Sequence, residues 1–146
     1  MADATVSSRL FLDTSFVQAR FSARDRYHSQ AVAFDRRLGN CREIWTTEAV
    51  LLEIGAAFRQ PSARSIPAIV WHQFHSDPVF RLAQVTGSLL DRGMELFRQR
   101  SDKAWSLADC VSFVLMEDQQ LTDALTCDHH FVQAGFRALL LEQSPA

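Results

Sequence analysis

Four acidic side chains are spaced so that folding could gather them around one or two metal ions: Asp13, Glu53, Asp109 and Asp128. Oxygen-only ligand sets of this kind suit Mg²⁺ or Mn²⁺. A hard divalent ion held by carboxylates lowers the pKa of a bound water and neutralises the charge that builds on a phosphodiester during in-line attack. These residue types therefore favour metal-dependent phosphodiester hydrolysis, which requires no His, Ser or Cys nucleophile.

Two of these acids follow short apolar runs that predict buried strands. Asp13 stands directly after residues 6–12, and Asp128 follows residues 123–126. In an open α/β sheet, the carboxyl ends of the strands and the adjoining helix N-termini line the same crevice. The two acids are therefore expected to meet there, although a plain helix cap or a turn residue would also explain each of them.

The other two acids lie in predicted helices. Asp109 stands three residues after Ser106, which resembles a capping box and explains this acid without any chemistry. Glu53 lies in a helix predicted from Thr47 to Phe58, and its neighbours at helical spacing are all alanine or valine. A buried carboxylate with no Lys or Arg at that spacing is costly unless it binds a metal. The alternative is a partly solvated Glu at a gap in the packing.

The elements that must position these acids alternate between strands and helices. Strands are predicted at residues 6–12, 43–46, 79–85, 123–126 and 137–141. Helices are predicted at residues 16–21, 25–38, 47–58, 62–74 and 87–99, then from a cap at Ser106 to Gln119-Gln120, with a further helical turn around Phe131. This alternation predicts an α/β fold with three α/β/α layers around a central parallel sheet of four or five strands.

Length and composition predict a single domain over residues 1–146, because 47% apolar residues suffice for one core. No uncharged run approaches the ~20 residues of a membrane span, and the first ten residues lack the pattern of a secretory signal, so a cytoplasmic protein is expected. The three cysteines, Cys41, Cys110 and Cys127, lack Cys-x-x-Cys spacing and are predicted to be buried, reduced thiols.

The net charge of −2 argues against a generic binder of polyanions. If the four acids surround a metal, however, the other 13 acidic residues against 15 basic ones leave a net charge of +2. Fourteen of those basic residues are arginine, the side chain best shaped for bidentate contact with phosphate.

The order of these motifs resembles the PIN-domain ribonucleases, and especially the VapC-type toxins of bacterial toxin–antitoxin pairs. The resemblance rests on Leu-Asp13-Thr-Ser, on Glu53 in an apolar helix, on Asp102-Lys-x-Trp-Ser-Leu-x-Asp109-Cys and on Leu-Thr-x-Asp128-His-His-Phe. It covers nearly the whole chain and implies that the four acids bind a divalent metal, Mg²⁺ or Mn²⁺, and are catalytic. It also implies that the small hydroxyl residues Thr14, Ser106 and Thr126 support them, whereas Asp102 receives no role.

Five basic residues are candidate contacts to RNA phosphates, with solvated surface as the equally weighted alternative: Arg20, Arg24, Arg26, Arg100 and Lys103. Single-stranded or looped RNA is the expected substrate, because open bases can stack on aromatic side chains such as Tyr27 or Trp105. Trp105 could equally anchor the core. His129 and His130 are interpreted as a strand-to-helix cap, or as solvent or phosphate contacts, because oxygen suits this metal better than imidazole.

The resemblance further implies a cognate antitoxin whose chain blocks the acidic crevice, for which a guanidinium is the natural plug. A homodimer is also expected, because the helices at residues 25–38 and 62–74 carry more apolar residues than one sheet face can cover. Three alternatives stay open: a housekeeping RNA-processing PIN nuclease, a non-catalytic PIN-fold binding module, and a phosphoryl-accepting Asp13. The last alternative is disfavoured because Thr14 and Ser15, rather than a second acid, follow Asp13.

Overall fold

The fold is built on one five-stranded sheet whose strands all run parallel, in the order β3-β2-β1-β4-β5. The structure is a computed structural model and describes residues 5–142. Its strands are β1 (Arg9–Leu12), β2 (Glu43–Thr47), β3 (Phe80–Ala83), β4 (Asp123–Leu125) and β5 (Arg137–Ala138). A sheet of five parallel strands confirms the predicted fold class.

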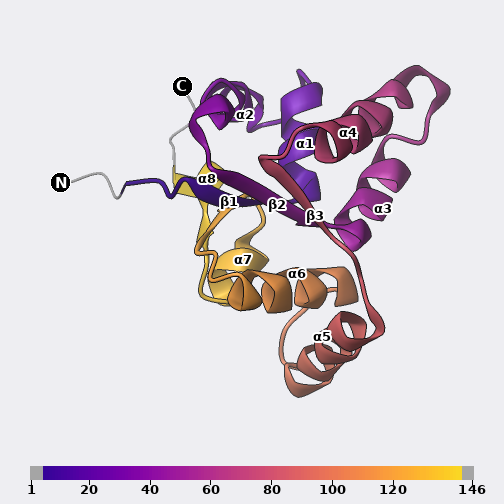
Figure 1. The fold of residues 1–146 in the computed structure, drawn as a ribbon, viewed down its shortest axis with the longest axis vertical. Coiled ribbons are helices and arrows are strands. Elements are labelled where there is room, and N and C mark those ends of the chain that lie inside the picture. The colour runs from indigo at the N-terminus through magenta and orange to yellow at the C-terminus, as the bar shows by residue number, and fades with distance from the viewer. Residues whose placement is uncertain (1–4, 143–146) are drawn as a thin grey trace.

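Helices cover both faces of this sheet (Figure 1). Their bounds are α1 (Thr14–Phe21), α2 (His28–Asp35), α3 (Glu48–Ala57), α4 (Ser65–Ser76), α5 (Gly87–Gln99), α6 (Leu107–Asp118), α7 (His129–Gln133) and α8 (Leu139–Glu142). Short 3₁₀ turns occur at Leu38–Asn40 and Pro61–Ala63. Helices α1, α2 and α4 lie on one side of the sheet, and α6 and α7 lie on the other. The predicted three-layer arrangement is therefore confirmed.

The strand order reverses at β1, and this reversal decides where a site can form. From β1 the chain passes outward to β2 and β3 on one side, whereas β4 and β5 lie on the other side. Leu12, the last residue of β1, pairs in register with Leu125, the last residue of β4. Crevices at such switch points are the usual ligand sites of open parallel sheets. The residues that follow β1 and β4, including Asp13 and Asp128, stand beside this crevice.

Helix α6 is deeply buried, because every residue from Cys110 to Met116 is buried. The Phe113 ring meets the rings of Trp105 and Phe131 edge-on, with centroids 5.0 Å apart in both pairs. Trp105 also donates a hydrogen bond from Nε1 to Gln133 at 2.9 Å. This aromatic cluster fixes α7 against α6, so the two acids that these helices carry are held in a constant relation.

The predicted strand at residues 137–141 is wrong in its second half. Only Arg137 and Ala138 pair with β4, and Leu139–Glu142 forms helix α8 with Leu139 and Leu140 buried. In the register of this pair, Leu139 would face Leu125, the last residue of β4, but the chain already turns into α8 at Leu139. A short apolar run cannot by itself distinguish a strand from a buried helix.

Two predicted helices begin later in the chain than their apolar patterns indicate. Asp25 accepts a hydrogen bond from the Tyr27 amide and forms a turn, so α2 starts only at His28. The second helix starts at Ser65, because Pro61 opens a separate 3₁₀ turn. In both places local turn chemistry delays the start of the helix beyond the start of its apolar stripe.

The cysteine prediction is confirmed for one thiol. Cys110 is buried, whereas Cys41 and Cys127 are partly exposed, and none of the three is in a disulfide. Among the described residues, no helix is both long and apolar enough to cross a membrane.

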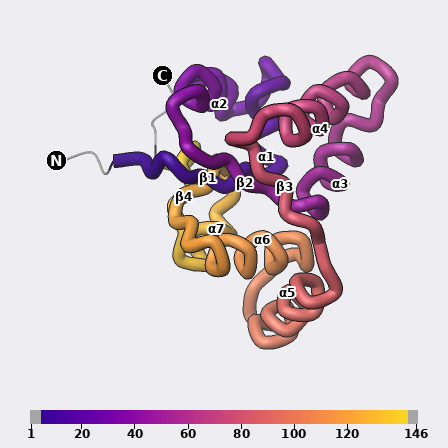
Figure 2. The backbone as a smooth tube through the Cα atoms, in the orientation of Figure 1, coloured from indigo at the N-terminus to yellow at the C-terminus, as the bar shows by residue number. Residues whose placement is uncertain are grey.

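Helix α5 lies outside α6 and does not cover the sheet, as the tube in Figure 2 shows. Its contact with α6 is close at Gly93. A Cβ atom at this position would lie 2.6 Å from Val111 Cγ2 and 3.3 Å from Val111 Cα. The absence of a side chain at Gly93 therefore allows the two helices to approach.

Gly93→Ala is expected to lower the free energy of unfolding by about 1–2 kcal/mol, because the added methyl group forces α5 away from Val111. The matched control is Gly55→Ala in α3, where a Cβ would meet nothing within 4 Å. That change is expected to stabilise the protein by up to about 1 kcal/mol through helix propensity. Urea unfolding of both variants measures the difference, and equal stability of the two would contradict the close contact.

Candidate functional site

Asp13 lies at the switch point, directly after β1, and is the N-cap of α1. It is only 7% exposed. Its Oδ2 atom accepts hydrogen bonds from Thr126 Oγ1 at 2.8 Å and from Ser15 Oγ at 2.9 Å. Burial nevertheless raises the pKa of this carboxyl above its usual value, outweighing the hydrogen bonds that favour the charged form. A nearby cation would therefore stabilise the ionised state that Asp13 holds poorly by itself.

Glu53 lies on α3, which packs against both α1 and α6. Its carboxylate accepts a hydrogen bond from Thr14 Oγ1 at 3.1 Å. Burial raises the pKa of Glu53, and the negative charges of Asp13, Asp109 and Asp128 raise it further. No ion pair with Glu53 occurs in the described part of the chain. This acid is thus held close to three others without a compensating charge.

Asp109 and Asp128 both cap helices. Asp109 forms a full capping box at the start of α6, accepting from the Ser106 amide at 3.0 Å while Ser106 Oγ accepts from the Asp109 amide at 2.9 Å. Asp128 caps α7 and accepts from the His130 amide at 2.9 Å. The structural explanation for both acids is therefore correct, but capping leaves part of each carboxylate free for a ligand.

The four acids line one hollow of about 390 Å³ at the carboxyl ends of β1 and β4. The other lining residues are Thr14, Ser15, Gln18, Ala56 and Ala57, so this lining contains neither Lys nor Arg. Clustered carboxylates without a basic partner are costly unless a cation joins them. The donor set fits Mg²⁺ or Mn²⁺, which bind carboxylate oxygens and retain several waters.

Each of the three predicted hydroxyl groups contacts one of the acids: Thr14 contacts Glu53, Ser106 contacts Asp109, and Thr126 contacts Asp13. Ser15 is a further supporting hydroxyl residue that the sequence did not predict. Its Oγ atom donates to Asp13, lies 2.9 Å from Thr126 Oγ1 and accepts from the Cys127 amide at 3.1 Å. Ser15 therefore ties the end of β1 to the end of β4. The signal for it is its position two residues after Asp13, where a backbone amide can donate to the aspartate side chain in an Asx turn, as the Ser15 amide does at 3.4 Å.

The two histidines differ in position. The His129 side chain is 69% exposed, whereas that of His130 is 21% exposed. The Nδ1 atom of His130 lies 3.3 Å from Asp109 Oδ2 and 3.2 Å from Asp128 Oδ1. His130 therefore does more than continue a helix cap, because its ring lies between two acids from different helices.

None of the five predicted RNA-contacting residues lines the hollow. Arg20 is ion-paired with Asp35 at 2.9 Å, and Arg100 is paired with Asp102 at 3.0 Å. Lys103 Nζ also lies 3.9 Å from Asp102, so this acid serves as a local partner for basic side chains. The guanidinium of Arg26 lies over the Tyr27 ring, 5.5 Å from its centroid, and Arg24 forms no ion pair within residues 5–142.

Base stacking on Trp105 is excluded by burial, because only 5% of this residue is exposed. Trp105 is a core anchor, which was the alternative interpretation. Tyr27 is partly exposed and stays available for stacking.

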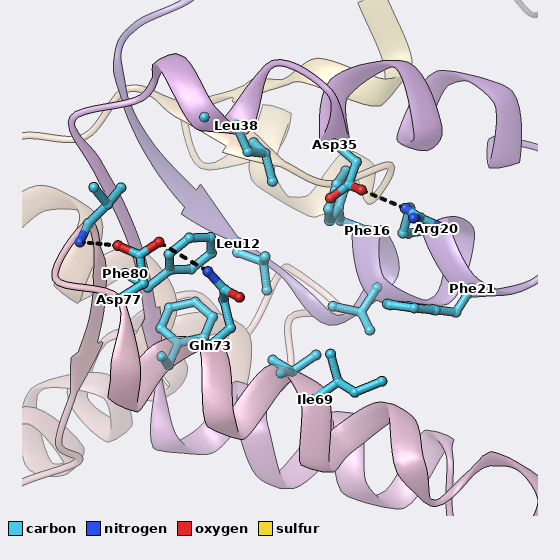
Figure 3. Close-up of a pocket in the computed structure, with 15 residues that line it drawn as sticks. Leu12, Phe16, Arg20, Phe21, Asp35, Leu38, Ile69, Gln73, Asp77 and Phe80 are labelled. Carbon is cyan, nitrogen blue, oxygen red and sulfur yellow. Dashed lines mark hydrogen bonds and ion pairs between the residues drawn. The ribbon is translucent and has the colours of Figure 1, made fainter.

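A larger cavity of about 520 Å³ lies between α1, α2 and α4, and Figure 3 shows its lining. Its labelled apolar side chains include Phe16, Ile69 and Phe80. The polar groups on its walls already have partners, since Arg20 pairs with Asp35 and Gln73 donates to Asp77 at 3.1 Å. This cavity therefore offers an apolar surface, whereas the four predicted acids line the separate acidic hollow.

Glu53→Gln is expected to stabilise the metal-free protein at pH 7 by about 0.5–1 kcal/mol, because it removes one of several mutually repelling charges. A raised folded-state pKa means that the folded chain holds its proton more tightly than the unfolded chain. The contribution of Glu53 to wild-type stability is therefore fully present below its usual pKa of 4.5. It is lost as pH rises through the raised pKa of the folded state. Urea unfolding in EDTA between pH 4 and 8 should show the advantage of the variant disappearing at the acidic end.

The control for this prediction is Glu117→Gln, which neutralises an exposed carboxylate at the end of α6. It should leave the pH dependence unchanged. If Glu53→Gln lowers the stability of the metal-free protein at pH 7, Glu53 is a stabilising residue and the repulsion argument is wrong.

Comparison with known proteins places the fold. No known family model and no curated protein matches this sequence. Among solved structures, VapC20 of Mycobacterium tuberculosis, described as a toxin that cleaves the sarcin–ricin loop, superposes with a TM-score of 0.78 at 24% identity, covering 88% of this chain and 97% of that one. FitAcB from Neisseria gonorrhoeae matches with a TM-score of 0.60 at 13% identity, covering 89% and 98% of the two chains.

Proposed function

We propose that this chain, which has the PIN-like fold of VapC20, is a metal-dependent endoribonuclease and the toxin of a toxin–antitoxin pair. The observation that carries the proposal is the hollow at the switch point, where Asp13, Glu53, Asp109 and Asp128 meet without a basic residue in the lining. VapC20 is described as a toxin that cleaves the sarcin–ricin loop, which supports RNA as the substrate class for this site.

The four acids would hold one or two Mg²⁺ or Mn²⁺ ions. When bound, such an ion lowers the pKa of a water and neutralises charge on the phosphodiester. The chain supplies the orientation. Thr126 and Ser15 fix the Asp13 carboxylate, Thr14 fixes Glu53, and backbone amides of the helix starts fix Asp109 and Asp128. Carboxylates held in this way need not reorganise during the reaction, which is where preorganised sites gain their rate.

Single-stranded or looped RNA is the proposed substrate, because the hollow is open to solvent at the carboxyl ends of the strands. Arg24, Arg26 and Lys103 are the proposed phosphate contacts. Arg20 and Arg100 would have to exchange their present carboxylate partners, Asp35 and Asp102, for phosphate. Both pairs are near the surface, where such exchange costs little.

An antitoxin protein is the proposed partner, and a guanidinium from it is the proposed plug for the acidic hollow. The apolar cavity between α1, α2 and α4 supports this proposal, because α1 contributes residues to both cavities and a partner chain that crosses α1 would reach both. We also propose a homodimer. On α4, Ile69 and Trp71 are each 54% exposed, which supports burial against a second chain, and light scattering of the purified protein measures the mass directly.

The test is cleavage of a synthetic RNA hairpin with an unpaired loop. Cleavage is expected with Mg²⁺ or Mn²⁺ and should stop in EDTA, with products that lack a 2′,3′-cyclic phosphate because water rather than the 2′-hydroxyl attacks. Cleavage that continues in EDTA and leaves cyclic phosphate would contradict the proposed mechanism. Binding of the hairpin without cleavage in either metal would favour a non-catalytic PIN-fold module.

A further inference from the structure

His130 occupies a position that its place in the helix cap does not explain. Its backbone amide donates to Asp128 Oδ1 at 2.9 Å, which accounts for the nearness of its ring to Asp128. It does not account for Asp109, which belongs to α6 and whose Oδ2 atom lies 3.3 Å from His130 Nδ1. The ring is directed there by the packing of α7, whose Phe131 is fully buried against the α6 residue Phe113.

The Nδ1 atom of His130 is buried and has no hydrogen-bond partner within the described residues. It lies 3.2 Å from Asp128 Oδ1 and 3.3 Å from Asp109 Oδ2, but not in the direction that a hydrogen bond to either oxygen requires. A buried polar atom without a partner is uncommon and often marks a bound ion or water. The atom thus lies between two carboxylates without a hydrogen bond to either, although His130 itself is not among the residues that line the acidic hollow.

The distances from His130 Nδ1 to the two carboxylate oxygens, 3.2 and 3.3 Å, are close to the distance between two ligand atoms of one metal ion. Neighbouring ligands at about 2.1–2.2 Å from an octahedral ion lie about 3 Å from each other. Ligand atoms of Asp128, His129 and His130 also lie within 4.8 Å of one another, so a second imidazole is close by. Of the two imidazoles, that of His130 is the less exposed one and the one that lies beside Asp109.

We propose that His130 Nδ1 is a nitrogen ligand to the divalent ion held by Asp109 and Asp128, so that this site prefers a first-row transition ion over Mg²⁺. The inference rests on the proposed function, since it concerns the same metal site. Mg²⁺ strongly prefers oxygen, whereas imidazole binds first-row transition ions well. Mn²⁺ suits both the carboxylates and the ring, and it is the probe of choice because it is paramagnetic.

The experiment is electron spin-echo envelope modulation of Mn²⁺ bound to the full chain. A directly bound imidazole gives nitrogen modulation that an all-oxygen site lacks, and growth with ¹⁵N-histidine should change that modulation in the wild-type protein. In His130→Gln the modulation should disappear, and the Kd for Mn²⁺ should rise about tenfold or more while the Kd for Mg²⁺ changes less than about twofold. The matched control is His129→Gln, in which the modulation should persist.

Each alternative outcome identifies what is wrong. Mn²⁺ that binds the wild-type chain, and is lost in Asp109→Asn, but shows no histidine nitrogen would overturn this inference and leave the proposed carboxylate site intact. Loss of the modulation in His129→Gln but not in His130→Gln would assign the ligand to His129 and overturn it as well. Failure of the wild-type chain to bind Mn²⁺ at all would overturn the proposed metal dependence too. If His130→Gln does not fold, the isotope measurement on the wild-type chain still shows whether a histidine binds the ion, and His129→Gln shows whether that histidine is His129.

Discussion

Replacement of Asp13 by asparagine is expected to reduce RNA cleavage by about 10³-fold or more while the protein stays folded. Asparagine keeps the shape of the side chain and can still accept from Thr126 Oγ1 and Ser15 Oγ, the two hydroxyls that position Asp13. Only the negative charge is lost. Because burial makes that charge unfavourable in the metal-free protein, its removal should not lower the melting temperature. Single-turnover cleavage in Mn²⁺ and thermal melting in EDTA measure the two effects separately.

The same expectation holds for Glu53→Gln, Asp109→Asn and Asp128→Asn, with a stability loss of at most about 1 kcal/mol for the two capping acids. Asp91→Asn is the matched control, because Asp91 is an exposed carboxylate on α5 outside the hollow. It should cleave like the wild type. If Asp109→Asn unfolds the protein and Asp128→Asn cleaves normally, both acids are only helix caps and the proposed metal site is wrong.

Expression of the chain alone in a bacterial host is expected to arrest growth, because an unrestrained endoribonuclease destroys RNA that the cell needs. Growth should resume when the protein encoded by the neighbouring reading frame is expressed with it, since an antitoxin that inserts a guanidinium into the hollow competes with the metal. Colony counts after induction, with and without the second protein, measure both effects.

The Asp13→Asn variant is the control for this expression experiment and should be harmless at the same protein level, whereas Asp91→Asn should still arrest growth. Harmless expression of a chain that cleaves RNA in vitro would instead favour the housekeeping RNA-processing nuclease. Growth arrest that persists in Asp13→Asn would show that toxicity has a cause other than the acidic hollow.

The positions of the four acids along the chain were predictable because each stands at a point that sequence marks clearly. Asp13 and Asp128 follow apolar runs, Asp109 completes a capping box, and Glu53 is the polar exception in an apolar helix. The parallel sheet was predictable for the same reason, since alternating strands and helices allow few other arrangements. These signals are local, and each depends on only a few neighbouring residues.

What could not be predicted depends on contacts between distant segments. The ring of His130 meets Asp109 only because α7 packs against α6 through Phe131 and Phe113. Arg20 looked like a free phosphate contact, but it lies beside Asp35 of another helix. The last strand ends early because the chain turns into α8 and buries Leu139 and Leu140 in a core formed by other parts of the chain. Sequence spacing carries no information on such pairings until the fold itself is known.

The reversal of strand order at β1 also determines when during synthesis this site can exist. The bond from Thr126 to Asp13 joins residues 113 positions apart, and β4 lies directly beside β1. A ribosome that has released only the first hundred residues has made Asp13 and Glu53, but neither β4 nor Asp128. Because β4 lies between β1 and β5 in the sheet, the acidic hollow and the core around it are incomplete until β4 and Asp128 have emerged. The order in which the strands emerge therefore sets the point in synthesis at which the four acids can first come together.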